Sequence, residues 1–228
     1  MNLQNKTILI TGSSSGIGAA TALEFAKQKA KVIITYNKNK SSALSILKEC
    51  QKHSECALMK LEITNEKLIK DCLKQTIKKF FHLDILINNA GILHDKNFEE
   101  QTPSELKEQI AVNLTGTILF TWHALPILKK QKEAMIINIS SLAGKRGHGG
   151  FTAYSASKFG VRGFTQALAC ELPNNVRVYC VNPGLTSTPM TNFRGISTKI
   201  VAEKILETAL EVLNKKSGED VDLEEYSG

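Results

Sequence analysis

The chain has 228 residues, of which 42% are hydrophobic, and it carries a formal net charge of +7. This length and composition favour one α/β domain over residues 1–228 with a single core. We found no apolar run near the ~20 residues that span a bilayer and no signal-peptide pattern, so we expect no membrane association. The lysines are spread along the chain, which argues against a nucleic-acid partner.

The cysteines give a second constraint on the kind of protein. There are five, they are scattered, and they form no C-x-x-C pair, so we expect neither a metal site nor a disulfide framework. Reduced thiols are typical of proteins in a reducing compartment, and we therefore predict a cytoplasmic protein.

Short β-branched apolar runs alternate with longer amphipathic stretches along the chain. The expected strands are 6–11, 31–35, 56–61, 84–88, 134–139 and 176–181. The expected helices are 17–29, 42–50, 66–79, 103–130, 152–172 and 197–213. This order predicts an α/β fold with a doubly wound (Rossmann) parallel sheet of about seven strands and helices on both faces. The acidic tail, 219–228, is a weaker candidate for the seventh strand, because Asp and Glu are poor strand formers.

A glycine-rich loop, TGSSSGIG at residues 11–18, joins the first strand to the first helix. Glycines allow a tight turn and a close approach of the backbone to a ligand. The helix N-terminus offers free N–H groups and the positive end of a dipole to a phosphate. We therefore predict that this loop binds a dinucleotide.

Tyr154 and Lys158 lie four residues apart in a predicted helix and therefore on the same face. A nearby cation lowers the pKa of a phenol, so the pair is a candidate for acid and base chemistry. Taken alone, the same spacing is also common for a half-buried ring beside a solvated amine.

Together these motifs resemble the short-chain dehydrogenases/reductases over nearly the whole chain. The resemblance rests on the glycine loop, on NNAG at 88–91, on Y-x-x-x-K, and on Asn113, Ser141 and Pro183–Gly184 at the family's spacings. It implies an NAD(P)-dependent oxidoreductase that transfers a hydride between nicotinamide and a carbonyl or secondary alcohol. Bacterial 3-oxoacyl-carrier-protein reductases look similar around NNAGILHD, VNLTG and GFTAYSASKFGVRGFT, which favours a 3-oxoacyl thioester as substrate.

The resemblance also assigns roles to individual residues. The implied catalytic residues are Asn113, Ser141, Tyr154 and Lys158. Tyr154 is the general acid or base, Ser141 binds the substrate oxygen, and Asn113 interrupts its helix and holds a water. The implied cofactor contacts are Gly12, Ser14, Ser15, Gly16, Ile17, Gly18, Tyr36, Asn37, Lys38, Glu62, Ile63, Asn89, Ala90, Gly91, Tyr154, Lys158, Pro183, Gly184, Thr186 and Thr188.

The residue after the second strand bears on the choice of dinucleotide. An acid there selects NAD by binding the adenosine ribose, whereas this chain has Tyr36, and Asn37, Lys38 and Lys40 after it are candidates to bind a 2′-phosphate. This sequence favours NADP(H). NAD(H) stays open, because Ser15 stands where many NADP-binding members carry a basic residue.

Substrate and partners are less well defined by the sequence. Few residues separate Gly184 from Ser197, so we expect no large lid, and Lys145, Arg146 and His148 face either an anionic substrate or solvent. A small carbonyl or alcohol is the expected substrate, and an acyl carrier protein is a possible partner, although the loop after residue 172 is only PNN.

We also expect a homodimer or homotetramer. The helices 103–130 and 152–172 carry more apolar positions than one face needs. These are Leu119, Phe120, Trp122, Phe159, Val161 and Phe164. The alternative is that all of these residues face the sheet or the catalytic cleft. A dinucleotide-binding regulator or scaffold without turnover is the alternative function.

Overall fold

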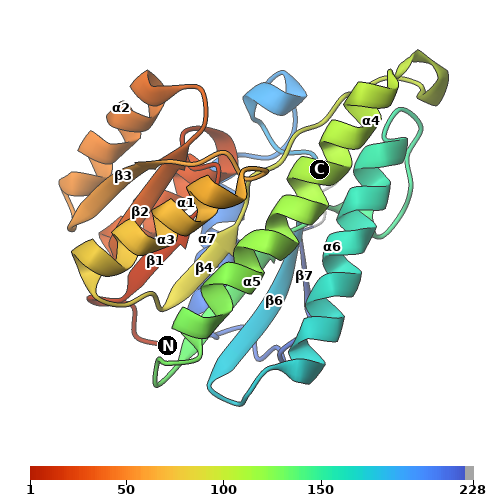
Figure 1. The fold of residues 1–228 in the computed structure, drawn as a ribbon. Helices are drawn as coiled ribbons and strands as arrows, with labels where there is room; N and C mark the ends of the chain where they lie inside the picture. The colour runs from red at the N-terminus through yellow and green to blue at the C-terminus, as the bar shows by residue number, and fades with distance from the viewer. Residues whose placement is uncertain (224–228) are drawn as a thin grey trace.

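The computed structural model describes residues 1–223, which form one seven-stranded sheet with helices on both faces (Figure 1). The strands are β1 (Thr7–Ile10), β2 (Lys31–Tyr36), β3 (Cys56–Lys60), β4 (Ile85–Asn88), β5 (Ala134–Ile139), β6 (Val176–Pro183) and β7 (Asp220–Leu223). Their order is β3-β2-β1-β4-β5-β6-β7, and every pairing is parallel. The predicted doubly wound sheet is therefore confirmed.

The helices divide between the two faces of the sheet. They are α1 (Gly16–Lys27), α2 (Lys40–Gln51), α3 (Glu66–Phe80), α4 (Pro103–Ile110), α5 (Gly116–Leu128), α6 (Thr152–Glu171) and α7 (Thr198–Leu210). Short 3₁₀ turns occupy Phe98–Glu100, Leu142–Gly144 and Pro189–Thr191. Figure 1 shows α3, α5 and α6 together in front of the sheet. Helices α1, α2 and α7 pack on the opposite core cluster.

Alternate residues of each strand enter the two cores. In β1, Ile8 and Ile10 pack toward α1, whereas Leu9 packs toward α3 and α5. All three side chains are fully buried, and each such aliphatic side chain contributes about 1.5–3 kcal/mol through its burial. Burial on both faces explains why the strands are near-continuous apolar runs in the sequence.

The long expected helix, 103–130, is continuous but changes its winding in the middle. Helix α4 passes through a π-helical segment, Ala111–Thr115, into α5. Asn113 is in this segment, so the predicted interruption lies where the sequence placed it. Such π-helical turns often occur at functional sites.

The combined helix Pro103–Leu128 is long and apolar enough, by length and composition, to cross a membrane. This differs from the sequence analysis, which found no such run. Phe120, Ala124 and Leu128 are fully buried in the core beneath α5, so packing on the sheet accounts for part of its apolar character, whereas Trp122 is exposed.

The acidic C-terminal segment does form the seventh strand, pairing with β6 over Asp220–Leu223. Residues 224–228 of the expected segment lie outside the described residues. Val221 and Leu223 are buried in the core, while the intervening Asp222 is exposed. The strand exists because its apolar residues alternate with acids that have partners on the other face of the sheet.

Candidate active site

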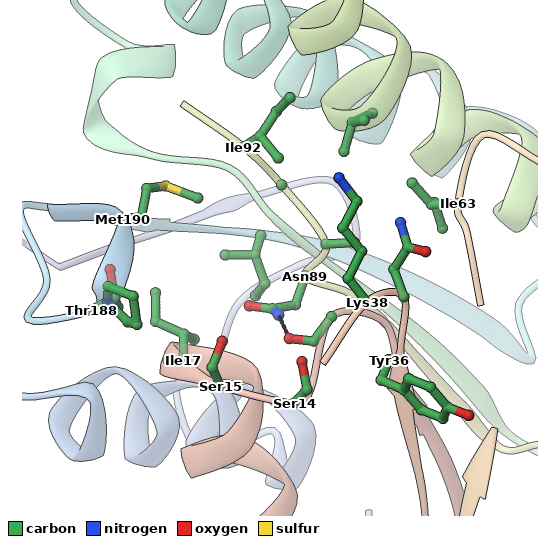
Figure 2. Close-up of a pocket in the computed structure, with 18 of the residues that line it drawn as sticks. Ser14, Ser15, Ile17, Tyr36, Lys38, Ile63, Asn89, Ile92, Thr188 and Met190 are labelled. Carbon is green, nitrogen blue, oxygen red and sulfur yellow. Dashed lines mark hydrogen bonds between the residues drawn. The ribbon is translucent and has the colours of Figure 1, made fainter. Parts of the chain in front are cut away.

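A cleft of about 470 Å³ opens at the carboxyl ends of the strands. Open parallel sheets bind ligands at this edge, where the strand order reverses, here between β1 and β4. In Figure 2, Ser14 and Ser15 lie on one side of the cleft, Thr188 and Met190 at one end, and Lys38 toward the other. Residues from both halves of the sheet therefore line one cleft and can contact the same ligand.

The glycine loop forms the floor of this cleft. Gly12 has a φ of +64°, and a Cβ there would lie 2.9 Å from the Cα of Ala90. The backbone N–H of Gly12 donates to Thr35 Oγ1 at 3.0 Å. Among residues 1–223, the Ser15 side chain makes no capping hydrogen bond to α1, so the first N–H groups of this helix stay available to an anion.

The segment after β4 locks onto the glycine loop. The backbone N–H groups of Asn89 and Ala90 both donate to Thr11 Oγ1 at 2.9 Å. The Asn89 amide also donates to the carbonyl oxygens of Thr11 and Gly12, at 2.9 and 3.1 Å. A Cβ on Gly18 would lie 2.5 Å from this amide, so the loop closes only with glycine at that position.

The far end of the cleft is lined by residues that follow β2 and β3. Tyr36 ends β2, Asn37 and Lys38 come from the connection after it, and Glu62 and Ile63 from the connection after β3. The Asn37 amide donates a hydrogen bond to the Glu62 carboxylate. Lys38 is exposed and is a cation at the mouth of this end.

The phenol and the amine singled out in the sequence meet at the end of β5. The Lys158 Nζ lies 5.6 Å from the centre of the Tyr154 ring and donates to the carbonyl oxygen of Ile139 at 2.8 Å. Burial lowers the pKa of Lys158 to about 8, an effect partly offset by the Cys180 thiol. Lys158 is thus a buried cation that loses its proton readily.

The pKa of Tyr154 differs from the sequence prediction. Burial raises this pKa above its usual value, and a hydrogen bond with Ser141 acts in the opposite direction. The expected lowering by Lys158 is therefore wrong for this structure, because desolvation of the phenolate outweighs the hydrogen bond with Ser141.

Asn113 connects two walls of the site. Its side chain accepts from the N–H of Ile92 at 2.8 Å and donates to the carbonyl oxygen of the same residue at 2.9 Å. It also donates to Ser157 Oγ on α6 at 3.1 Å. Asn113 is almost fully buried, so it fixes the segment after β4 against the helix that carries Tyr154.

Residues 6–197 match the family model of the short chain dehydrogenases. The chain belongs to this family. It is 38% identical over 212 residues to a 3-oxoacyl-[acyl-carrier-protein] reductase, FabG, of Thermotoga maritima, covering 92% of this chain and 83% of that protein. It is also 38% identical over 191 residues to the (2S)-[(R)-hydroxy(phenyl)methyl]succinyl-CoA dehydrogenase subunit BbsD of Thauera aromatica, covering 83% and 77%.

A solved short chain dehydrogenase from Burkholderia cenocepacia, in complex with NADP, has a TM-score of 0.91 to this structure at 26% identity, with 98% of both chains covered. The family and these relatives make the chain an oxidoreductase that acts on CH–OH or C=O groups.

Most of the residues predicted from the sequence of this dehydrogenase line one cleft. Those lining it are Gly12, Ser14, Ser15, Gly16, Ile17, Tyr36, Asn37, Lys38, Glu62, Ile63, Asn89, Ala90, Gly91, Tyr154, Lys158 and Thr188. The others are not among the residues that line it: Gly18, Asn113, Ser141, Pro183, Gly184 and Thr186. Gly18 and Asn113 support the walls, as described above, whereas Thr186 is buried and donates to the carbonyl oxygen of Gly184.

Some residues of the dehydrogenase site were missed by the sequence analysis. Ile92, Glu108, Val112, Ser140 and Met190 all line the cleft. Glu108 is one helical turn before Val112, and that spacing was the available signal for a shared face. Met190 carried no signal, because its place depends on how the chain turns after β6.

The loop before Tyr154 holds three residues, Lys145, Arg146 and His148, that were predicted to face either an anionic substrate or solvent. Lys145 pairs with Asp222 on β7 and therefore does not face the cleft. Arg146 and His148 are exposed. Of the three cations considered as contacts for an anionic substrate, one is thus already neutralised within the fold.

Proposed function

We propose that the chain reduces a carbonyl, or oxidises the matching secondary alcohol, with NADP(H) as hydride carrier and Tyr154 as general acid or base. The observation that carries this proposal is the pairing of Tyr154 with buried Lys158, whose Nζ lies 5.6 Å from the centre of the Tyr154 ring, in the cleft that the glycine loop also lines. Carbonyl reduction needs a hydride at carbon and a proton at oxygen, and this pair provides the proton.

The residues at the cleft fit a dinucleotide. Gly12 and Gly16 both have positive φ, and the backbone of this loop meets the N-terminus of α1, where a pyrophosphate is favoured. When bound, the nicotinamide supplies or accepts the hydride. Thr188 and Lys158 line the end of the cleft nearest Tyr154, where we place the nicotinamide-ribose half.

Several observations support NADP(H) over NAD(H). The residue at the end of β2 is Tyr36, so the carboxylate that selects an unmodified ribose is missing at that position. Lys38 lines the same end of the cleft and offers a charge to a 2′-phosphate. The Burkholderia cenocepacia dehydrogenase of similar fold binds NADP.

The side chains divide the proton chemistry between them. In reduction, Tyr154 donates its proton to the substrate oxygen, and Ser141 donates a hydrogen bond to that oxygen as negative charge develops. Lys158, with a pKa of about 8, is mainly protonated at neutral pH and supplies a positive charge beside the phenol. Asn113, in the π-helical segment, orders a water that resupplies the proton.

We propose a 3-oxoacyl thioester as the substrate class. Two relatives are named for acyl groups on acyl carrier protein and on coenzyme A. Ile92, Val112 and Met190 give the cleft apolar lining suited to an acyl chain. An acyl carrier protein is a possible carrier, although the loop after α6 offers it only Pro173, Asn174 and Asn175.

The test is a spectrophotometric screen of NADPH oxidation against 3-oxoacyl thioesters, simple ketones, quinones and sugars, with wild type and Tyr154→Phe. We expect turnover that Tyr154→Phe removes, with 3-oxoacyl-CoA and its carrier-protein form among the best substrates. A protein that binds NADPH but turns over none of these compounds would instead support a regulator or scaffold.

We propose that the chain forms a homodimer or homotetramer through α5 and α6. Trp122 on α5 is 67% exposed, and Phe159 on α6 is also exposed. Two of the positions proposed from the sequence, Phe120 and Val161, are buried inside the subunit and therefore cannot contribute to a contact between subunits. Light scattering of wild type and Trp122→Glu tests this, and a monomeric wild type at micromolar concentration would refute it.

The cysteines support a cytoplasmic location. All five are free thiols, and four of them are buried. A reducing compartment keeps such thiols free, so we propose that the enzyme works in the cytoplasm. Fractionation of the producing cells would test this.

A further inference from the structure

The turn that carries Ser141 is fastened to α6 at three points. Ser140 Oγ donates to the carbonyl oxygen of Lys158 at 2.8 Å, and Lys158 Nζ donates to that of Ile139 at 2.8 Å. One helical turn further along, Arg162 Nη1 donates to the carbonyl oxygen of Gly144 at 2.9 Å. These three bonds hold both ends of the short segment between β5 and the loop before Tyr154.

Residues 141–144 form one unit because they are hydrogen-bonded to one another. The N–H of Gly144 donates to the carbonyl oxygen of Ser141 at 2.9 Å, and the N–H of Ala143 donates to Ser141 Oγ at 3.1 Å. A Cβ on Gly144 would lie 2.8 Å from the carbonyl carbon and oxygen of Lys158, so the turn sits directly on the helix. A shift of the Gly144 carbonyl therefore shifts Ser141.

Arg162 is in turn held by the C-terminal strand. Its Nε donates to Asp220 Oδ1 and Oδ2 at 3.2 and 3.1 Å, and its Nη2 donates to Oδ2 at 2.5 Å. The side chains are only 18% and 17% exposed. Burial alone would raise the pKa of Asp220, but hydrogen bonds from Arg162 and Asn182 lower it below its usual value.

A second acid of the same strand acts beside the first. Asp222 accepts from Asn182 Nδ2 at 2.8 Å and pairs with Lys145, the residue directly after Gly144. Asp220 and Asp222 lie two residues apart and therefore on one face of β7. The strand thus ties down the Ser141 turn through two neighbouring ion pairs.

We propose that Asp220 is a positioning residue: through Arg162 it holds the Gly144 carbonyl and thereby sets the place of Ser141 Oγ for catalysis. The inference rests on the proposed function, in which Ser141 hydrogen-bonds the reacting oxygen. Stabilisation of developing charge depends on small differences in the donor's position, so a link two residues removed from the substrate affects the rate.

Arginine is needed at position 162 because it binds in two directions. One edge of its guanidinium binds the carboxylate, while Nη1 reaches the carbonyl oxygen. A lysine carries the same charge on a single nitrogen and cannot keep both contacts in this geometry. Arg162→Lys therefore separates the charge of this side chain from its positioning function.

The experiment compares Asp220→Asn and Arg162→Lys with wild type, using steady-state reduction of the best substrate and NADPH titration. We expect kcat to fall roughly tenfold, from misplacement of one donor. The dissociation constant for NADPH should change little, because neither Arg162 nor Asp220 lines the cleft. Unchanged kcat in both variants would overturn the inference.

A matched control is available at the opposite end of the sheet. Arg177 Nε pairs with Glu211 Oε1 at 2.6 Å, with side chains 27% and 28% exposed. Arg177→Lys should lower the melting temperature about as much as Arg162→Lys while leaving kcat unchanged. An equal fall of kcat in Arg162→Lys and Arg177→Lys would show that lost stability lowers kcat in general, and the proposed positioning role of Asp220 and Arg162 would be rejected. If Asp220→Asn does not fold, Arg162→Lys decides the question alone.

A double-mutant cycle separates this inference from the proposed function. In a Ser141→Ala background, Arg162→Lys should lower kcat no further, since the residue through which it acts is gone. If Ser141→Ala keeps full activity, the proposed function fails. If Ser141→Ala loses activity but the effect of Arg162→Lys remains additive, the proposed function stands and positioning fails.

Discussion

The glycine loop and the loops at the substrate end of the cleft both depend on glycine and small polar residues, yet they are held differently. The glycine loop is hydrogen-bonded to elements on both sides: the Gly12 N–H donates to Thr35 Oγ1 on β2, and the Asn89 amide after β4 donates to the Gly12 carbonyl oxygen. At the other end, Phe193 is 71% exposed, and Asn192 and Phe193 adopt positive φ after a single 3₁₀ turn.

This contrast separates two tasks within one site. A dinucleotide has a fixed shape, so a preformed template of backbone N–H groups binds it well. Acyl chains vary, and the hydrogen bonds of segment 185–197 lie mainly within the segment, such as that from the Ile196 N–H to the Leu185 carbonyl oxygen at 2.9 Å, so we expect this segment to adapt to them more readily than the glycine loop. Changes in the bonded half should therefore affect cofactor binding strongly, whereas changes in the exposed half should alter substrate binding in small steps.

The largest effect is expected where the two halves meet, at Tyr154. Tyr154→Phe removes only the phenolic oxygen and should lower kcat by about 10²–10⁴-fold, the usual contribution of a general acid. Titration should show an NADPH affinity close to wild type. A variant that keeps more than about a tenth of the rate would mean that another group supplies the proton.

In the bonded half, Gly18→Ala should weaken NADPH binding about tenfold or more. The added methyl group would lie 2.5 Å from the Asn89 amide and 2.6 Å from the Gly12 carbonyl oxygen, and overpacking of this kind costs about 1–3 kcal/mol. Isothermal titration calorimetry measures the change.

Gly163→Ala on α6 is the matched control for this substitution. Among the described residues, nothing lies within 4 Å of a Cβ at this position. The same change in chemistry should therefore stabilise the helix by about 0.5–1 kcal/mol and leave NADPH binding alone. Equal losses of affinity in the two variants would contradict the tight closure of the loop.

Lys38→Gln should weaken NADPH binding by about tenfold while leaving NADH binding nearly unchanged. A hydrogen bond to a charged group contributes about 1.5–3 kcal/mol, and only NADPH carries the 2′-phosphate. Lys40, which begins α2 outside the cleft lining, is the control. If Lys38→Gln weakens both cofactors alike, the side chain recognises something other than the 2′-phosphate.

The features that could be predicted from the sequence are those that depend on local backbone geometry or on chain topology. Gly12 and Gly18 were recognisable because their roles depend on backbone geometry that glycine permits at a fixed spacing, and Asn89 was recognisable through the resemblance of NNAG to the family. The parallel sheet with helices on both faces followed from the periodicity and from the alternation of strands and helices along the chain. These features are local or topological, so they can be deduced without tertiary contacts.

Other features depend on packing and were not predictable. The raised pKa of Tyr154 results from burial, which a sequence spacing does not report. The strand β7 was a weak prediction because the partners of its acids, such as Arg162 for Asp220, are far away in the sequence. Phe120 and Val161 were misplaced because helix periodicity alone does not show which apolar face meets the sheet.

The affinity for NADPH should fall as pH rises above about 8, the pKa to which burial lowers Lys158. The anionic cofactor favours protonated Lys158, so binding raises this pKa, and affinity declines between the free and bound values. Titrations from about pH 7 to about pH 9.5 should show a fall of up to about tenfold per unit, and Lys158→Met should show none. An equal slope in the variant would assign the titration to another group.

The smallest effect is expected in the exposed half, at Met190. This side chain lines the cleft and is still 42% exposed, so its truncation leaves little cavity behind. Met190→Ala should raise the KM for a long 3-oxoacyl thioester by only about threefold, corresponding to less than one methylene of lost burial. Because the glycine loop does not depend on this side chain, the NADPH dissociation constant should stay the same. The measurement is a KM series over acyl chains of increasing length, in which the variant and wild type should converge for the shortest chain. A loss of NADPH affinity as large as the change in KM would show that Met190 contacts the cofactor rather than the acyl chain, and its assignment to substrate binding would then be wrong.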